Sequence, residues 1–149
     1  MQDKHEKTAL MIAACGGHLE CISLVLSKES GMQDSDGRTA LMMATQKSHL
    51  EYLRLLLEKE AGIHDRFGRT SLMKAVSNNN LECAKLLLEK EGGIKTESGW
   101  TALIEAASNG YLECVRLLSE KENGMGLKKA GLLLFGRQVI IIQNTYDYS

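Results

Sequence analysis

The 149-residue sequence contains no proline, and only 5% of its residues are aromatic. It also lacks an excess of charge of either sign, because 18 Lys and Arg residues face 19 Asp and Glu residues, for a net charge of −1. A chain this close to neutral has no general attraction for a phosphate backbone or an anionic lipid surface. We therefore expect no nucleic acid and no membrane surface among its partners.

Long apolar runs are missing as well. The two longest, residues 131–135 and 139–142, fall well short of the roughly 20 residues that a membrane-spanning helix needs. The first residues lack the charged and apolar regions of a signal peptide. The four cysteines include no CxxC pair. Together these absences predict a chain outside the membrane, in a reducing, cytoplasmic setting.

The motifs of catalysis are absent too. No segment resembles a glycine-rich phosphate loop, a nucleophile with its base, or paired acids in a pocket. The four histidines, His5, His18, His49 and His64, are scattered, whereas a zinc site needs converging ligands. We expect no enzymatic activity, no cofactor, no metal and no small-molecule substrate.

The sequence does contain an internal repeat, since it matches itself when shifted by 31 residues. Nine of the 31 positions are identical in all four copies: a Thr, a Leu, an Ala, a Leu-Glu pair, a second Leu, a Lys-Glu pair and a Gly. The Thr column is Thr8, Thr39, Thr70 and Thr101, and the Gly column is Gly31, Gly62, Gly93 and Gly124. We define units one to four as residues 1–31, 32–62, 63–93 and 94–124.

Each unit is predicted to form two short helices. The Thr is placed to cap the first helix, and apolar residues follow at helical spacing. A second apolar face follows the break near Gly17 and its equivalents, and the unit's last glycine stops that helix with a left-handed residue. One such pair cannot bury its own apolar face, so the pairs must stack. The predicted fold class is an all-α solenoid.

The motifs resemble those of ankyrin repeats. Residues 37–41, Gly-Arg-Thr-Ala-Leu, are similar to the family's G-x-T-P-L motif, as are their equivalents at 68–72 and 99–103. The Ala13-Ala14 and Gly17-His18 pairs resemble the A-A-x-x-G-H stretch. The short period and the Glu-Lys-Glu-Ala-Gly run at 58–62 are similar to the expanded ankyrin family of diplomonad protists, in which some arrays follow a NEK-type kinase domain.

The sequence also departs from the family pattern. The family period is 33, and the two missing residues fall in the projecting hairpin, so we expect shorter hairpins between the units. Ala or Ser replaces the usual Pro at the first helical position. The Thr caps alone should still contribute about 1 kcal/mol per unit.

The repeat stops near residue 126. Leu132-Leu133-Leu134 stands where Thr-Ala-Leu is expected, and residues 139–142 have no counterpart upstream. Residues 125–149 are therefore predicted to be a degenerate fifth repeat or a C-terminal cap or tail, with residues 139–142 strand-like or irregular. An array that continues further, or a sticky strand exposed to a partner, are the alternatives. Uncapped apolar ends would also permit end-to-end self-association.

Two further columns have ordinary structural interpretations. Cys21, Cys83 and Cys114 share one column and are expected to be small buried hydrophobic residues, with Cys15 the exposed thiol. The Lys-Glu pair recurs in every unit, and we expect it to lie on a solvated helix end.

The ankyrin resemblance implies that a protein partner docks on the concave side of the stack, on the hairpin tips and the exposed flank of each first helix. Arg38, Arg69 and Trp100 share a column there, although Trp100 could instead cover a neighbouring turn. The candidate contact residues are Arg38, Gln46, Lys47, Arg66, Phe67, Arg69, Lys74, Trp100 and Glu105. The predicted function is a non-catalytic protein-interaction scaffold; a regulatory array of a larger kinase polypeptide and a structural spacer are the alternatives.

Overall fold

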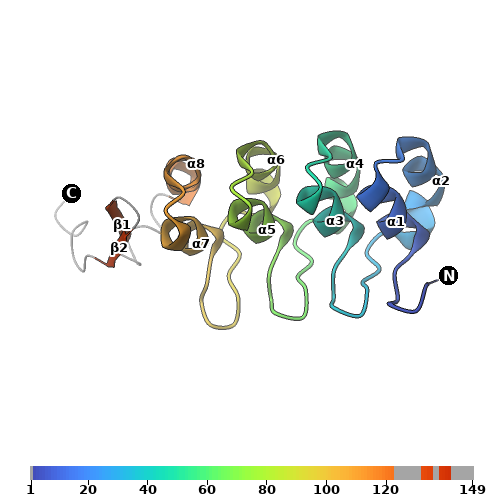
Figure 1. Cartoon of the computed structure of the whole chain (residues 1–149), viewed down its shortest axis with the longest axis horizontal. Helices are drawn as coiled ribbons and strands as arrows, with labels where there is room; N and C mark the ends of the chain where they lie inside the picture. The colour runs from blue at the N-terminus through green and yellow to red at the C-terminus, as the bar shows by residue number, and fades with distance from the viewer. Residues whose placement is uncertain (1, 123–131, 136–137, 142–149) are drawn as a thin grey trace.

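The computed structural model describes residues 2–122, 132–135 and 138–141. Eight helices form four antiparallel pairs that stack in a single row (Figure 1). In chain order they are α1 Ala9–Gly16, α2 Leu19–Glu29, α3 Ala40–Gln46, α4 Leu50–Glu60, α5 Ser71–Ser77, α6 Leu81–Glu91, α7 Ala102–Asn109 and α8 Leu112–Glu122. The prediction of an all-α helical-repeat solenoid is confirmed.

The first helix of every unit begins at its threonine. The side chains of Thr8, Thr39, Thr70 and Thr101 each accept a hydrogen bond from the backbone N–H three residues later. This bond satisfies one of the amides that a helix start leaves without a partner. The threonines are themselves almost completely buried in the first three units, so the cap lies inside the stack.

In units one to three, the second helix ends in a type II turn. Ser30 has φ −62° and ψ 138°, Gly31 has φ 84°, and the Met32 N–H donates to the Glu29 carbonyl at 3.2 Å. The third position of this turn requires a positive φ, which glycine adopts without strain. The repeated glycine is therefore left-handed, as predicted, but it lies one residue beyond the helix C-cap.

In units two and three the glutamate before the turn lies inside the structure, whereas Glu29 of unit one is half-buried. Glu60 and Glu91 are each only 1% exposed. One oxygen of Glu60 accepts the Leu41 N–H at 2.7 Å, and the other accepts the Gly31 N–H of the preceding unit at 3.0 Å. Glu91 repeats both bonds one unit later. The prediction of a solvated Lys-Glu pair is correct for the lysines and wrong for these glutamates, because the carboxylates satisfy helix-start and turn amides.

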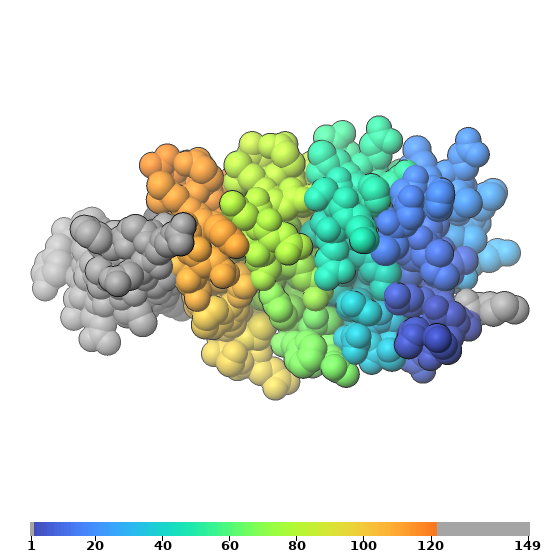
Figure 2. All heavy atoms as spheres, in the orientation of Figure 1, coloured from blue at the N-terminus to red at the C-terminus, as the bar shows by residue number. Residues whose placement is uncertain are grey.

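The core follows the repeat. Leu10, Leu41, Leu72 and Leu103 are at most 1% exposed, and the alanines three residues later are nearly as deeply buried. Each buried leucine contributes about 1.5–3 kcal/mol relative to an exposed one. Small alanines let neighbouring first helices approach, and every first helix contacts the first helix of the next unit. The core is thus one continuous layer along the row. In the space-filling view, neighbouring units pack directly against one another (Figure 2).

The cysteine column is only partly buried. Cys83 and Cys114 have no exposed surface, as predicted, but Cys21 is exposed. Cys21 belongs to unit one, and no helix pair precedes that unit in the part of the chain that the structure describes. The prediction for Cys21 is wrong because burial in this column depends on a neighbouring unit.

Two strands follow the helices. β1 Leu132–Phe135 and β2 Gln138–Ile141 pair antiparallel, with Leu132 opposite Ile141, and both contact α7. Most of the predicted cap or tail, residues 123–131, 136–137 and 142–149, lies outside the described residues. Among those described, no helix is both long and apolar enough to cross a membrane.

Candidate functional site

Four hairpins project from the same edge of the stack (Figure 1). We name them hairpins one to four: residues 2–8, 33–39, 64–70 and 95–101. In hairpin two, the Asp34 N–H donates to the Arg38 carbonyl, and Asp34 Oδ1 accepts the N–H groups of Asp36 and Arg38. Asp65 makes the same bonds in hairpin three. One aspartate oxygen therefore shapes each loop and leaves the second oxygen for another partner.

In hairpin two that second oxygen binds arginine. Arg38 Nε and Nη2 both lie 2.9 Å from Asp34 Oδ2, and Nη2 lies 3.3 Å from Asp36. The Arg38 side chain remains 30% exposed. Arg38 is therefore held within its own hairpin and still presents part of its guanidinium to solvent.

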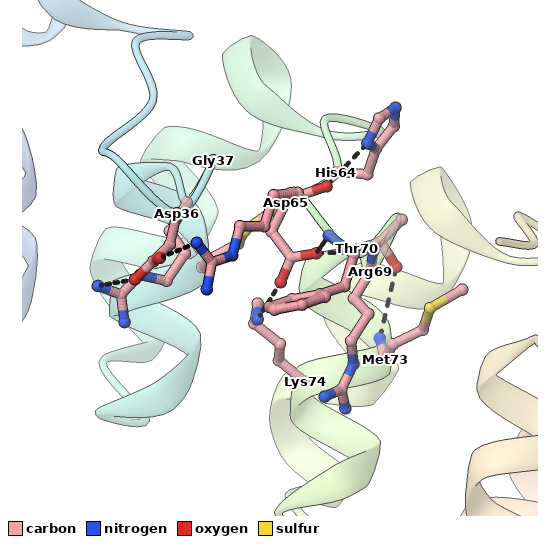
Figure 3. A network of polar contacts seen from close by, with 12 residues as sticks. Asp36, Gly37, His64, Asp65, Arg69, Thr70, Met73 and Lys74 are labelled. Carbon is pink, nitrogen blue, oxygen red and sulfur yellow. Dashed lines mark hydrogen bonds and ion pairs between the residues drawn. The ribbon is translucent and has the colours of Figure 1, made fainter. Parts of the chain in front are cut away.

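In hairpin three the second oxygen binds lysine instead. Lys74, on α5, places Nζ 2.8 Å from Asp65 Oδ2 (Figure 3). Burial alone would raise the pKa of Asp65, but the hydrogen bond from Lys74 and the loop amides hold that pKa below its ordinary value of 3.8. Lys74 is only 8% exposed. This buried ion pair occupies the ammonium group of Lys74, so little of this predicted contact residue is accessible to a partner.

Arg69, the equivalent of Arg38, is free to reach the next unit. Its Nη2 lies 3.0 Å from Ser77 Oγ and 3.7 Å from Glu105 Oε1, and Ser77 donates to the same carboxylate at 2.7 Å. Trp100 Nε1 donates to Glu105 Oε2 at 2.7 Å. We call Arg69, Ser77, Trp100, Glu105 and Asn109 the junction network, since they tie unit three to unit four.

The junction network determines the charge state of its carboxylate. Burial would raise the pKa of Glu105, but the bonds from Ser77 and Trp100, the nearby Arg69 charge and the Asn109 amide hold it below its ordinary value of 4.5. Glu105 is therefore charged at neutral pH.

The comparison with protein families gives one match. A model of ankyrin repeats in three copies matches residues 1–66 and 58–129. The chain belongs to the ankyrin repeat family. No curated protein matches its sequence. Ankyrin repeats are generally protein–protein interaction modules, and the family is typically non-catalytic.

The ankyrin scaffold brings some predicted contact residues together and separates others. Arg69, Trp100 and Glu105 meet in the junction network. Arg66 and Phe67 lie at the tip of hairpin three, with the Arg66 guanidinium 4.8 Å from the centre of the Phe67 ring. Gln46 and Lys47 are exposed at the end of α3, and no hydrogen bond or ion pair of the described residues joins them to either group.

Two exposed aromatic side chains stand out on this ankyrin surface. Phe67 is 65% exposed, and Trp100 is 39% exposed although its indole N–H is bonded. Trp100 therefore has a fixed orientation and an accessible ring. The list of candidate contact residues did not include Asp65, Ser77 or Asn109. The sequence signal for Asp65 was its identity with Asp34 in the same column.

Two other kinds of site, a metal centre and a reactive thiol, would depend on side chains within residues 2–121, the range whose side chains the structure describes. No group of three or more His, Cys, Asp and Glu side chains there could hold a metal ion. Burial raises the pKa of Cys83 to about 11, so this thiol is a poor nucleophile at neutral pH.

Proposed function

We propose that this ankyrin array is a non-catalytic scaffold that binds a protein partner on the concave face, around the boundary between units three and four. The observation that carries the proposal is the pair of aromatic side chains, Phe67 and Trp100, held in fixed orientations by charged neighbours and still accessible. Aromatic and arginine side chains supply most of the binding energy at protein interfaces.

Pre-organisation supports this assignment. Glu105 binds the Trp100 indole, and Arg66 stacks on the Phe67 ring, so a partner need not order these side chains on binding. Immobilising a flexible side chain costs roughly 0.5–1.5 kcal/mol at an interface. The remaining exposed predicted residues, Arg38, Gln46 and Lys47, would lie on the rim of the contact.

Affinity capture from native cytosol with the full chain as bait tests the proposal. Phe67→Ala with Trp100→Ala should weaken capture of the partner by at least about 2 kcal/mol, or roughly thirtyfold in Kd. The folded array should keep its helical circular dichroism and its unfolding midpoint, because both rings are outside the core.

A matched control removes apolar area elsewhere. Leu24 and Leu55 are 78% and 42% exposed, on second helices, so Leu24→Ala with Leu55→Ala should leave capture unchanged. Equal capture by wild type and the Phe67/Trp100 variant would refute the proposal.

The four free cysteines support the cytoplasm as the proposed compartment, since reduced thiols are usual there.

A further inference from the structure

The first unit of the row has side chains that are more exposed than their equivalents in the later units. Units one and four form the two ends of the row of helix pairs (Figure 1). Ile12, in unit one, is 54% exposed, whereas its equivalents Met43 and Lys74 are 4% and 8% exposed. Cys21 is exposed in a column where Cys83 has no exposed surface. Unit one therefore presents the half of a unit boundary that a preceding unit covers elsewhere in the row.

Unit four exposes the complementary half of a boundary. Ile104 is half-buried, whereas Met11, Met42 and Met73 in the same column are at most 1% exposed. Val115 is also half-buried, and its three equivalents have no exposed surface. These two columns are fully covered only where another unit follows. Although β1 and β2 contact α7, they do not provide the cover that a following unit provides.

The hydrogen bond that joins consecutive units lacks its donor at the unit-one end. Oε1 of Glu60 and Oε1 of Glu91 each accept the turn glycine N–H of the preceding unit at 3.0 Å. Glu29 Oε2 accepts the Leu10 N–H at 2.8 Å, as in the later units, but no hydrogen bond between described residues reaches Glu29 Oε1. In the sequence, Gly124 occupies the column of the donor in unit four. The two ends therefore carry the acceptor and the residue type of its donor.

The charges at the two ends are complementary in the same way. Lys90 and Lys121 each form an ion pair with a glutamate of the preceding unit, at 3.3 Å and 2.9 Å. Lys28 occupies this lysine column in unit one, and Glu120 occupies the glutamate column in unit four. Both are exposed, and neither forms an ion pair with another described residue. A cation at one end and an anion at the other thus stand at positions that pair at the internal boundaries.

We propose that unit one of one chain stacks on unit four of a second copy and so repeats the internal boundary between two molecules. Ile12 would pack against the face that contains Ile104 of the second copy, and Lys28 would pair with its Glu120. The incoming unit would replace β1 and β2 on α7, because first helices of consecutive units contact each other at every internal boundary. Two different faces meet in this head-to-tail contact, so each copy can bind on both sides.

Sedimentation of the full chain over a range of concentrations tests the proposal. The average mass should rise with concentration below about 1 mM, and a chain that stays monomeric up to that concentration would overturn the proposal. Assembly should also slow the reaction of Cys21 with a thiol reagent. Cys15 should keep its rate, because its equivalent Gln46 is exposed even inside the row.

A lysine at the unit-one face should block assembly. Ile12→Lys should fold normally, since unit three has Lys74 in the same column, and should weaken association at least about tenfold because the new charge would be buried at the contact. Ser23→Lys is the matched control. It adds the same charge to α2 in an exposed column where the later units have basic residues, so it should assemble like wild type.

Mixing variants tests the head-to-tail geometry. Ile104→Lys blocks the unit-four face, so neither it nor Ile12→Lys should assemble alone. An equimolar mixture should form a heterodimer, because each variant retains one intact face. Association of Ile104→Lys as tight as that of wild type would overturn the head-to-tail contact, as would a mixture of two folded variants that stays monomeric.

A charge exchange keeps the test decisive if Ile104→Lys does not fold. Lys28 and Glu120 are both exposed, so their variants should unfold at the same denaturant concentration as wild type. Lys28→Glu should weaken association about threefold, and adding Glu120→Lys to the same chain should restore it. Equal association of the single and double variants, both weaker than wild type, would show that Lys28 does not face Glu120 of the second copy.

Discussion

Asp34 and Asp65 occupy the same position in consecutive hairpins, and their side chains shape identical loops, yet they bind different cations. Asp34 pairs with the half-exposed Arg38 from its own hairpin, whereas Asp65 pairs with the buried Lys74 from α5. Lys74 stands where unit two has the apolar Met43. Lys74 therefore replaces the hairpin arginine on the aspartate, and Arg69 instead reaches Glu105, which occupies the same column in unit four.

The largest expected effect is a difference in stability between variants of the two aspartates. Asp65→Asn leaves the Lys74 ammonium buried without its counter-charge and should lower the free energy of unfolding by about 3 kcal/mol or more. Asp34→Asn should cost about 1 kcal/mol, because Arg38 can turn to solvent. Urea unfolding followed by circular dichroism measures both, and equal losses would contradict the comparison.

A smaller effect should follow when unit three is made to resemble unit two. With Lys74→Met, Asp65 Oδ2 becomes available to Arg69, and we expect the cost to be about 1 kcal/mol, since an apolar side chain fills the same buried space. In this background Asp65→Asn should cost no more than Asp34→Asn. The double-mutant cycle should therefore give a coupling of roughly 1–3 kcal/mol between Asp65 and Lys74.

The pairing of Asp65 with Lys74 also shows which features of the structure could be predicted from the sequence and which could not. The Thr caps and the turn glycines were predictable because each depends on neighbouring residues and a known backbone geometry. The burial of Lys74 was not predicted because a lysine on a helix flank is normally exposed, and only the position of Asp65 in space shows its partner.

Glu60 and Glu91 were missed for a related reason. The Glu-Lys-Glu sequence is typical of a solvated helix end, and the turn amides that bury these carboxylates come from 19 and 29 residues away. Identity in all four units gave no signal of burial, because the adjacent lysine and the Glu of the Leu-Glu pair are also identical in all four units and are exposed. In contrast, the ankyrin resemblance placed Arg69, Trp100 and Glu105 on one predicted contact surface.

The smallest predicted effect concerns pH. The pKa of Glu105 is lowered in the folded state. The contribution of this carboxylate to the free energy of unfolding is therefore present above about pH 4.5 and is lost as the pH falls through the folded pKa. Burial raises the pKa of Glu60 despite the amides from Gly31 and Leu41. Its contribution is therefore fully present below pH 4.5 and is lost as the pH rises through the folded pKa.

The opposite pH dependences of Glu105 and Glu60 can be measured by comparing the unfolding free energy of each variant with that of wild type. Unfolding free energies of wild type and Glu105→Gln should converge on acidification from pH 7 to pH 4, whereas those of wild type and Glu60→Gln should diverge in favour of wild type. Parallel curves for Glu105→Gln would show that the junction network does not depend on its charge.

The bond from each buried glutamate to the preceding glycine has a consequence for how the array can change in length. Unit two carries both halves of the connection: Glu60 accepts the Gly31 N–H of the unit before it, and the Gly62 N–H donates to Glu91 of the unit after it. A duplication or deletion of 31 residues therefore restores the same carboxylate–amide bond at the new boundary, whatever the surface residues are. An insertion of any other length places a different residue opposite the carboxylate and leaves a buried charge without its amide, so the array can grow or shrink only by whole units.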